Sequence, residues 1–433
     1  MDGRRNNGTM RRAAAALCAM AAMLGTAGCA SAGQSAGAGA VAPPEPGQAL
    51  DLFVGGDGRA GVYRIPALAV LPSGTLLAFA ESRESLADNG LNSIVMRRST
   101  DGGGSWTRVG NVVAEPTASL NNPCVTVVET GPHAGRVLLM FQRYPLGIGE
   151  DAVVAGVEGD RVCRCFIMHS DDEGRTWSAP TEITSQVRRA TGATSAASGP
   201  GRGIQLTRGP HAGRIVVPFN EGPPGKWRVY SVFSDDGGDT WKLGLCAPNS
   251  SPGMGNECQV EQLADGTLLM VSRQEKGGGV RKVTRSRDGG ATWGALVDEP
   301  ALPCPSVMGG LVAMPPVEGA TATRLVFTGP DSRKHRVDGC AWVSFDGGRT
   351  WPTKLPIFPG FFAYSQPVAL APDMVGVLFE RDDYKAISFM RLRVPTTAPA
   401  PAPGGKEKRK GGTRIFESTG GKGAGTKDPA TTP

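Results

Sequence analysis

Aspartate and tryptophan recur at a fixed spacing along the chain, and together they could bind carbohydrate. The pattern Ser-x-Asp-x-Gly-x-Ser/Thr-Trp occurs five times and ends at Trp106, Trp177, Trp241, Trp293 and Trp351. One interpretation is a ladder of sugar-binding residues. We favour a turn in which the carboxylate accepts backbone N–H groups, glycine adopts a positive φ and tryptophan is buried between neighbouring units. A ligand site would differ from one repeat to the next.

Cysteine and histidine are the other residue types that could form a site. The chain has nine cysteines and four histidines. Cys163 and Cys165 are too close for an easy disulfide with each other, and their spacing does not match a zinc site. We interpret the cysteines after Cys29 as buried thiols, and we predict no metal and no cofactor.

The elements that position these residues are predicted to be short strands. Apolar runs such as Leu76–Ala80, Arg136–Met140 and Thr267–Val271 alternate with Gly, Asp and Asn turns. The box tryptophans follow one another at 52 to 71 residues, the length of a four-stranded unit. Residues 50–394 have room for about six such units. We therefore predict an all-β fold, a six-bladed β-propeller of four-stranded blades with box hairpins, closed by pairing of its N- and C-terminal strands.

The N-terminal residues are typical of an export signal. Four arginines precede the apolar run Ala13–Leu24, and Thr26-Ala27-Gly28-Cys29 resembles a lipoprotein cleavage box. We expect a signal peptide over 1–29 and a secreted or cell-envelope location, periplasmic or extracellular. The protein is then either lipid-anchored at Cys29 or freely secreted, and an anchor would be its only contact with a membrane.

Composition separates the folded part from its flanks. Residues 30–49 are predicted to be a flexible linker, and 395–433 a disordered, basic tail rich in proline and glycine. The formal net charge of +6 comes from the two ends, whereas residues 50–400 sum to zero. A neutral folded part does not indicate a nucleic-acid partner, and we expect a monomer.

Three stretches outside the boxes indicate a family. Tyr63–Leu68, which contains Arg64-Ile65-Pro66, resembles a motif of bacterial sialidases, as do Gly199–Leu206 and Asn256–Val260. The boxes themselves resemble the Asp-box, or BNR, repeats of that family. The resemblance covers residues 50–394. It implies an exo-α-sialidase, or neuraminidase, that removes terminal α-linked sialic acid from glycans, glycoproteins or glycolipids.

The resemblance also implies a set of site residues. Sialic acid has a carboxylate beside its anomeric carbon, which guanidinium groups can bind with paired hydrogen bonds. A neutral tyrosine avoids the repulsion that an attacking carboxylate would meet there. The implied nucleophile is Tyr364, with Glu257 as its base and Asp88 as general acid and base. The implied reaction retains the configuration of the anomeric carbon. The implied carboxylate ligands are Arg64, Arg273 and Arg336, with Arg83 near the 4-position of the sugar.

Other interpretations of the same residues remain open. Arg333 and Lys334 lie next to Arg336 and could be confused with it. Asp88 could be a turn former and Glu257 a strand-edge acid. The protein could be a trans-sialidase or a glycosidase for a related 2-keto sugar acid. A different class is a non-catalytic propeller that binds glycans or protein, although such a module would not need all of the site residues.

Overall fold

The computed structural model describes residues 45–400. The predicted signal peptide, Cys29, most of the linker and nearly all of the predicted tail lie outside the described residues. Within 45–400, no helix is long and apolar enough to cross a membrane.

Antiparallel strands arranged in five sheets make up almost all of the regular structure. The first sheet contains β2 (Val62–Val70), β3 (Leu76–Arg83), β4 (Ser93–Ser99) and β5 (Gly110–Val113). The second contains β6 (Ala118–Val127), β7 (Val137–Pro145), β8 (Arg164–Ser170) and β9 (Thr181–Glu182), with β11 (Gly201–Arg202) parallel to β6. The third contains β10 (Ala196–Ser198), β13 (Ile215–Glu221), β14 (Arg228–Ser234) and β15 (Lys242–Leu243), with β12 (Ile204–Gln205) also paired to β13.

The last two sheets follow in chain order. The fourth contains β16 (Met254–Gln262), β17 (Leu268–Glu275), β18 (Val280–Ser286) and β19 (Val297–Pro303). The fifth has seven strands: β20 (Gly310–Ala313), β21 (Leu325–Pro330), β22 (Val337–Ser344), β23 (Thr353–Ala371), β24 (Met374–Arg381), β25 (Ala386–Arg393) and β1 (Ala49–Val54). The helix α1 (Thr184–Val187) is a single turn.

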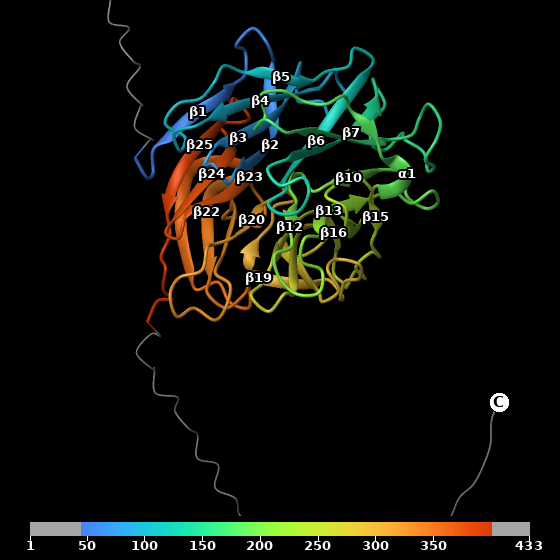
Figure 1. Cartoon of the computed structure of the whole chain (residues 1–433). Coiled ribbons are helices and arrows are strands. Elements are labelled where there is room, and N and C mark those ends of the chain that lie inside the picture. Colours follow the sequence, from blue (N-terminus) through green and yellow to red (C-terminus); the bar gives the residue numbers. More distant parts are fainter. Residues whose placement is uncertain (1–44, 401–433) are drawn as a thin grey trace, which may run out of the picture. The chain divides into compact units, whose positions relative to one another are not determined.

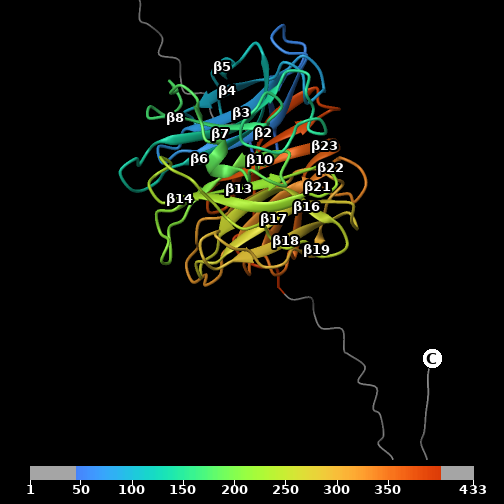
Figure 2. The ribbon, with the colours of Figure 1, turned by 90° about the vertical axis from the view of Figure 1, so that its right-hand side faces the viewer.

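The sheets follow one another around the molecule in a propeller-like arrangement (Figures 1 and 2). Strand β2 contacts β6 and β23, β13 contacts β16, and β20 contacts both β16 and β23. The all-β prediction is confirmed. So is the predicted pairing of the terminal strands, because β1 pairs with β25 and lies beside it in Figure 1.

The seven-stranded sheet differs from the predicted row of separate four-stranded blades. Strand β23 is 19 residues long, and its first part pairs with β22 whereas its second part pairs with β24. A single continuous strand therefore joins two groups of strands that the repeat spacing predicts as separate units.

The five boxes form the predicted turns between the third and fourth strands of their units. In the box that follows β8, Ser170 Oγ donates to Asp172 Oδ1 at 2.8 Å and accepts from the Gly174 N–H at 2.8 Å. Hydrogen bonds from the side chain and backbone of Thr176 lower the pKa of Asp172 to about 2. The same bonds recur in the other four boxes. Their carboxylates are therefore occupied within the turn.

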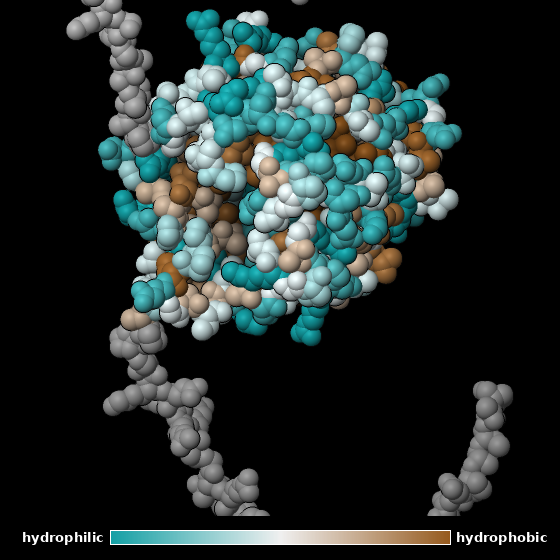
Figure 3. Space-filling view, viewed as in Figure 1, coloured by the Kyte–Doolittle hydropathy of each residue, from teal (hydrophilic) through white to brown (hydrophobic). Residues whose placement is uncertain are grey.

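The box tryptophans pack against neighbouring strands to different extents. Trp241, Trp293 and Trp351 are buried, whereas Trp106 and Trp177 are partly buried. Trp106 contacts Phe389 of β25, with ring centroids 5.3 Å apart. Most large apolar side chains lie between sheets, and hydrophilic residues cover much of the face shown in Figure 3. All seven described cysteines are free thiols, and all but Cys246 are buried.

Candidate active site

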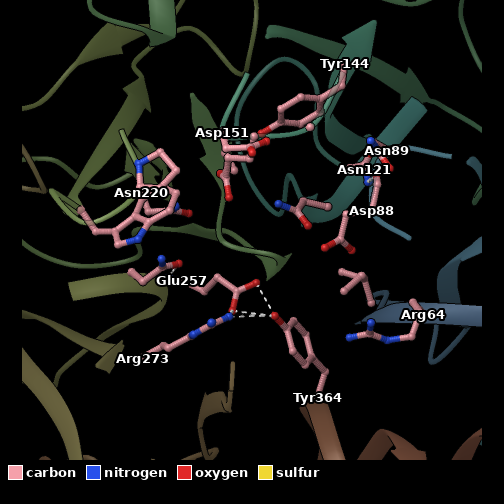
Figure 4. A pocket seen from close by; sticks show the side chains of 18 of the residues that line it. Arg64, Asp88, Asn89, Asn121, Tyr144, Asp151, Asn220, Glu257, Arg273 and Tyr364 are labelled. Carbon is pink, nitrogen blue, oxygen red and sulfur yellow. Dashed lines mark hydrogen bonds and ion pairs between the residues drawn. The ribbon is translucent and has the colours of Figure 1, made fainter. Parts of the chain in front are cut away.

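All seven predicted site residues line a single cavity of about 630 Å³. They come from three of the five sheets: β2 and β3 with the loop that follows, β16 and β17, and the sheet that contains β22 and β23. Figure 4 shows Tyr364, Glu257 and Arg273 in contact on one side and Tyr144 and Asp151 on the opposite side. The arrangement thus collects residues from distant parts of the chain.

At the centre of the site a phenol is hydrogen-bonded to a carboxyl group. The Tyr364 hydroxyl on β23 lies 2.7 and 2.8 Å from the two carboxylate oxygens of Glu257 on β16. Arg273 on β17 lies 2.8 Å from Glu257 Oε2 and 3.1 Å from the Tyr364 hydroxyl. Its other terminal nitrogen is 2.5 Å from Glu275. A base and a cation therefore both contact the phenolic oxygen.

The surroundings of Tyr364 favour the neutral form of its phenol. Burial, and then the neighbouring Glu257 carboxylate, raise the pKa of the phenol well above its ordinary value, while Arg273, Arg64 and Arg336 oppose that rise. A phenol with a raised pKa is protonated at neutral pH. It becomes a good nucleophile only if its proton moves to an acceptor as it attacks, and Glu257 is within hydrogen-bonding distance.

Arg64 is placed by a bulge in β2 and by a buried acid. The register between β2 and β3 shifts between Arg64 and Ala67, and Ile65 has φ 59°. Glu380 on β24 accepts from Arg64 Nε at 2.7 Å and from the Ile65 N–H at 2.8 Å. The guanidinium carbon lies 5.3 Å from the ring centroid of Tyr364. Although burial opposes it, Glu380 raises the pKa of Arg64, which keeps this buried group cationic.

Arg336 differs from Arg64 and Arg273 in its hydrogen-bonding partners. It donates to the Tyr384 hydroxyl at 2.5 Å and to the Ser306 carbonyl at 2.9 Å. Within residues 45–400 it forms no ion pair with a carboxylate. Arg333 and Lys334 are exposed and do not line the cavity, so the geometry selects Arg336 from the three neighbouring cations.

Asp88 lies in the loop between β3 and β4, across the cavity from Glu257 (Figure 4). Its side chain is 83% exposed and accepts from Arg83 at 2.6 Å. Arg83 is itself buried and bonded to Glu81 at 2.5 Å. The Asp88 carbonyl accepts from Asn92, Ser119 and Asn121, each at 3.0 Å. The backbone is thus held while the carboxyl group remains accessible.

Comparison with known proteins places the chain in a family. The sequence model of the BNR repeat-like domain matches residues 74–371, well over half of the chain. The chain belongs to this BNR repeat-like family. A sialidase of Micromonospora viridifaciens is 36% identical over 388 residues, which cover 86% of this chain. The chain spans 58% of that protein's length.

Solved structures of other proteins are similar in fold to this chain. The Hadza microbial sialidase Hz136 has a TM-score of 0.70 at 28% identity, covering 80% of this chain and 68% of that one. The intramolecular trans-sialidase from Ruminococcus gnavus, at 19% identity, has a TM-score of 0.68 and covers 81% and 98% of the two chains. The second likeness concerns the fold alone.

Sequence reasoning missed four residues of this BNR repeat-like site. Glu380 forms an ion pair with Arg64, and Glu81 forms one with Arg83. Tyr384 accepts a hydrogen bond from Arg336, and Glu150 lines the cavity. A signal for the first two was present, because each acid directly follows an apolar run within a strand. A buried carboxylate needs a cation or several donors, so an acid in that setting indicates a buried ion pair.

Proposed function

We propose that this protein is an exo-α-sialidase that hydrolyses terminal α-linked sialic acid with retention of configuration. The observation that carries the proposal is the contact of the Tyr364 hydroxyl with Glu257 in a cavity lined by four arginines. Relatives that match most of the chain are sialidases, which supports the same substrate class.

The arginines are suited to bind the carboxylate of the sugar. Arg64, Arg273 and Arg336 all lie close to Tyr364, at 5.3 and 5.9 Å from its ring for Arg64 and Arg336 and at 3.1 Å from its hydroxyl for Arg273. Because Arg64 and Arg273 already have carboxylate partners, Arg336 contributes the guanidinium charge that is least neutralised. A charge-assisted bond of this kind contributes about 1.5–3 kcal/mol.

The proposed reaction consists of two successive displacements at the anomeric carbon. In the first, the Tyr364 oxygen bonds to the anomeric carbon, Glu257 accepts the phenolic proton, and Asp88 donates a proton to the leaving oxygen as the glycosidic bond breaks. In the second, Asp88 accepts a proton from water, whose oxygen bonds to the anomeric carbon. The bond to Tyr364 breaks, and Glu257 returns the proton to the phenol. Two inversions give net retention.

A fluorinated sialosyl substrate tests the assignment of the nucleophile. We expect a covalent adduct on the peptide that contains Tyr364, detected by mass spectrometry, and the α-anomer as the first product by NMR. Tyr364→Phe and Glu257→Ala should each lose most of the turnover, and the double variant should be little worse than the poorer single one. An adduct on a carboxylate, or the β-anomer first, would overturn the assignment. Release of free sialic acid distinguishes hydrolysis from transfer.

We also propose that the seven-stranded sheet contains two blades, which gives the propeller six. The division of β23 between β22 and β24 supports this count. An experimental structure tests it, since two blades require the two halves of β23 to belong to separately twisted sheets. A single evenly twisted sheet would contradict the count.

A further inference from the structure

Glu150 lines the active-site cavity without a cationic partner. Its Oε1 accepts a hydrogen bond from Ser195 Oγ at 3.1 Å. Within residues 45–400 the carboxyl group forms no ion pair and no other hydrogen bond. Burial raises the pKa of Glu150 to about 7; the bond from Ser195 lowers it, Glu257 and Asp88 raise it further, and Arg273 opposes them. A large fraction of this carboxyl group is therefore neutral near pH 7.

The loop between β7 and β8 holds Glu150 in a defined position. Tyr144, Val153 and Cys163 form a buried apolar cluster within this segment, and Ile148 packs against it. The Gly147 N–H donates to the Asn89 carbonyl at 3.0 Å, and Asn89 Nδ2 donates to the Gly147 carbonyl at 3.2 Å. These bonds join the loop to the residue that follows Asp88. Glu150 is thus fixed with respect to the proposed general acid.

The charge of the expected ligand decides which form of Glu150 is useful. A sialoside is an anion, and an ionised, unpaired Glu150 in the same cavity would repel it. The neutral carboxyl group has an O–H donor instead. Because Ser195 occupies Oε1, the proton is best placed on Oε2, which has no partner among the described residues.

We propose that Glu150 binds the sugar in its neutral form, donating a hydrogen bond from Oε2 to an uncharged oxygen of the substrate. Glu150 is then a specificity-determining residue that favours an anionic sugar with an oxygen acceptor at this position over one with a cationic substituent. The proposal rests on the proposed sialidase function and assigns part of the same cavity. It also couples substrate binding to pH.

Tyr144, Cys163 and Arg273, which also surround Glu150, do not account for the same pH dependence of KM. Burial raises the pKa of both the Tyr144 phenol and the Cys163 thiol, so neither ionises before Glu150 does. Glu257 raises the pKa of Arg273, although burial opposes it, and Arg273 stays cationic. The charged or titratable groups that face Glu150 from the packed elements are Glu257, Arg273, Asp88, Tyr144 and Cys163, with Asp151 next to it in the loop.

Steady-state kinetics with a fluorogenic sialoside between about pH 5 and 9 test the proposal. For the unmodified protein, KM should rise about tenfold per pH unit above about pH 7, because one proton is lost. Glu150→Gln keeps a neutral donor, so its KM should stay flat over that range. Glu150→Leu should raise KM about fivefold at every pH below 7. Glu158→Gln is the matched control, since Glu158 is exposed in the same loop, and it should behave as the unmodified protein does.

Calorimetry gives a second, independent measurement. Binding of free N-acetylneuraminic acid at about pH 7.5, measured in two buffers of different ionisation enthalpy, should show proton uptake for the unmodified protein and none for Glu150→Gln. Retention of the rise in KM or of the proton uptake in Glu150→Gln would overturn the proposal. An unchanged KM in Glu150→Leu would do so as well. If the unmodified protein cleaves the sialoside while these tests fail, only the role of Glu150 is wrong; if it cleaves none, the sialidase function fails too.

Discussion

Glu380 supports two parts of the site at once, and its replacement by glutamine tests the reasoning about buried charge. The fully buried carboxylate accepts from Arg64 Nε at 2.7 Å, from the Ile65 N–H at 2.8 Å and from the Tyr364 N–H at 3.1 Å. Glutamine has one carbonyl oxygen and adds an N–H₂ group. It therefore removes the negative charge beside Arg64 and leaves at least one buried donor without an acceptor.

The expected loss of stability follows from the loss of this charge and of one acceptor. Removing one partner of a buried ion pair typically costs about 3–5 kcal/mol, because the other charge stays buried without compensation. Since a domain is usually stable by about 5–15 kcal/mol, Glu380→Gln should remove a large part of the free energy of unfolding. Displacement of Arg64 and of the Tyr364 backbone should also lower kcat/KM by at least an order of magnitude.

Urea unfolding followed by tryptophan emission measures the first effect. Asp373→Asn is the control, because Asp373 pairs with Arg393 at an exposed site and its loss should cost about 0.2–1 kcal/mol. The double variant Arg64→Met with Glu380→Gln should recover part of the lost stability but not the activity, since it removes both charges and keeps an amide oxygen that can accept from a buried backbone N–H. If Glu380→Gln were no less stable than Asp373→Asn, the buried pair would not hold this part of the fold.

Two further predictions concern Arg336 and the box tryptophans. Arg336→Met should raise KM for a sialoside about tenfold or more while the melting temperature stays nearly constant, because Arg336 has no carboxylate partner within residues 45–400. A large fall in the melting temperature of this variant would indicate a structural role instead. Trp241→Ala should cost about 3–5 kcal/mol because the side chain is buried, lowering the melting temperature in calorimetry. The fraction that remains folded should keep its kcat, and a selective loss of kcat at full stability would place the box in the active site.

The features predicted correctly from the sequence are those with local signals. A box turn is formed by bonds among residues at most four apart, such as Asp172 and Thr176, so eight residues suffice to recognise it. The seven site residues were reached through short motifs of a known family, and they line one cavity. Their chemical roles remain predictions.

The features that were missed depend on contacts between distant residues. Arg64 and Glu380 are 316 positions apart, and no local pattern specifies that pairing. The raised pKa of Glu150 depends first on its burial and then on Glu257 and Asp88, which lie on other elements. The continuity of β23 across two groups of strands was also missed, because an apolar run indicates a strand but not the number of partners along its length.

The pairing of β1 with β25 joins two segments that are synthesised at very different times. Residues 49–54 leave the ribosome long before residues 386–393, which are their partners. Until then β1 has no partner for the hydrogen bonds of its edge, and Arg64 has neither Glu380 nor Tyr364 beside it. Contacts of such high sequence separation form slowly and leave strand edges exposed to aggregation meanwhile. The candidate site therefore cannot be complete before these last strands are in place, and the proposed activity should be confined to chains whose terminal strands have joined.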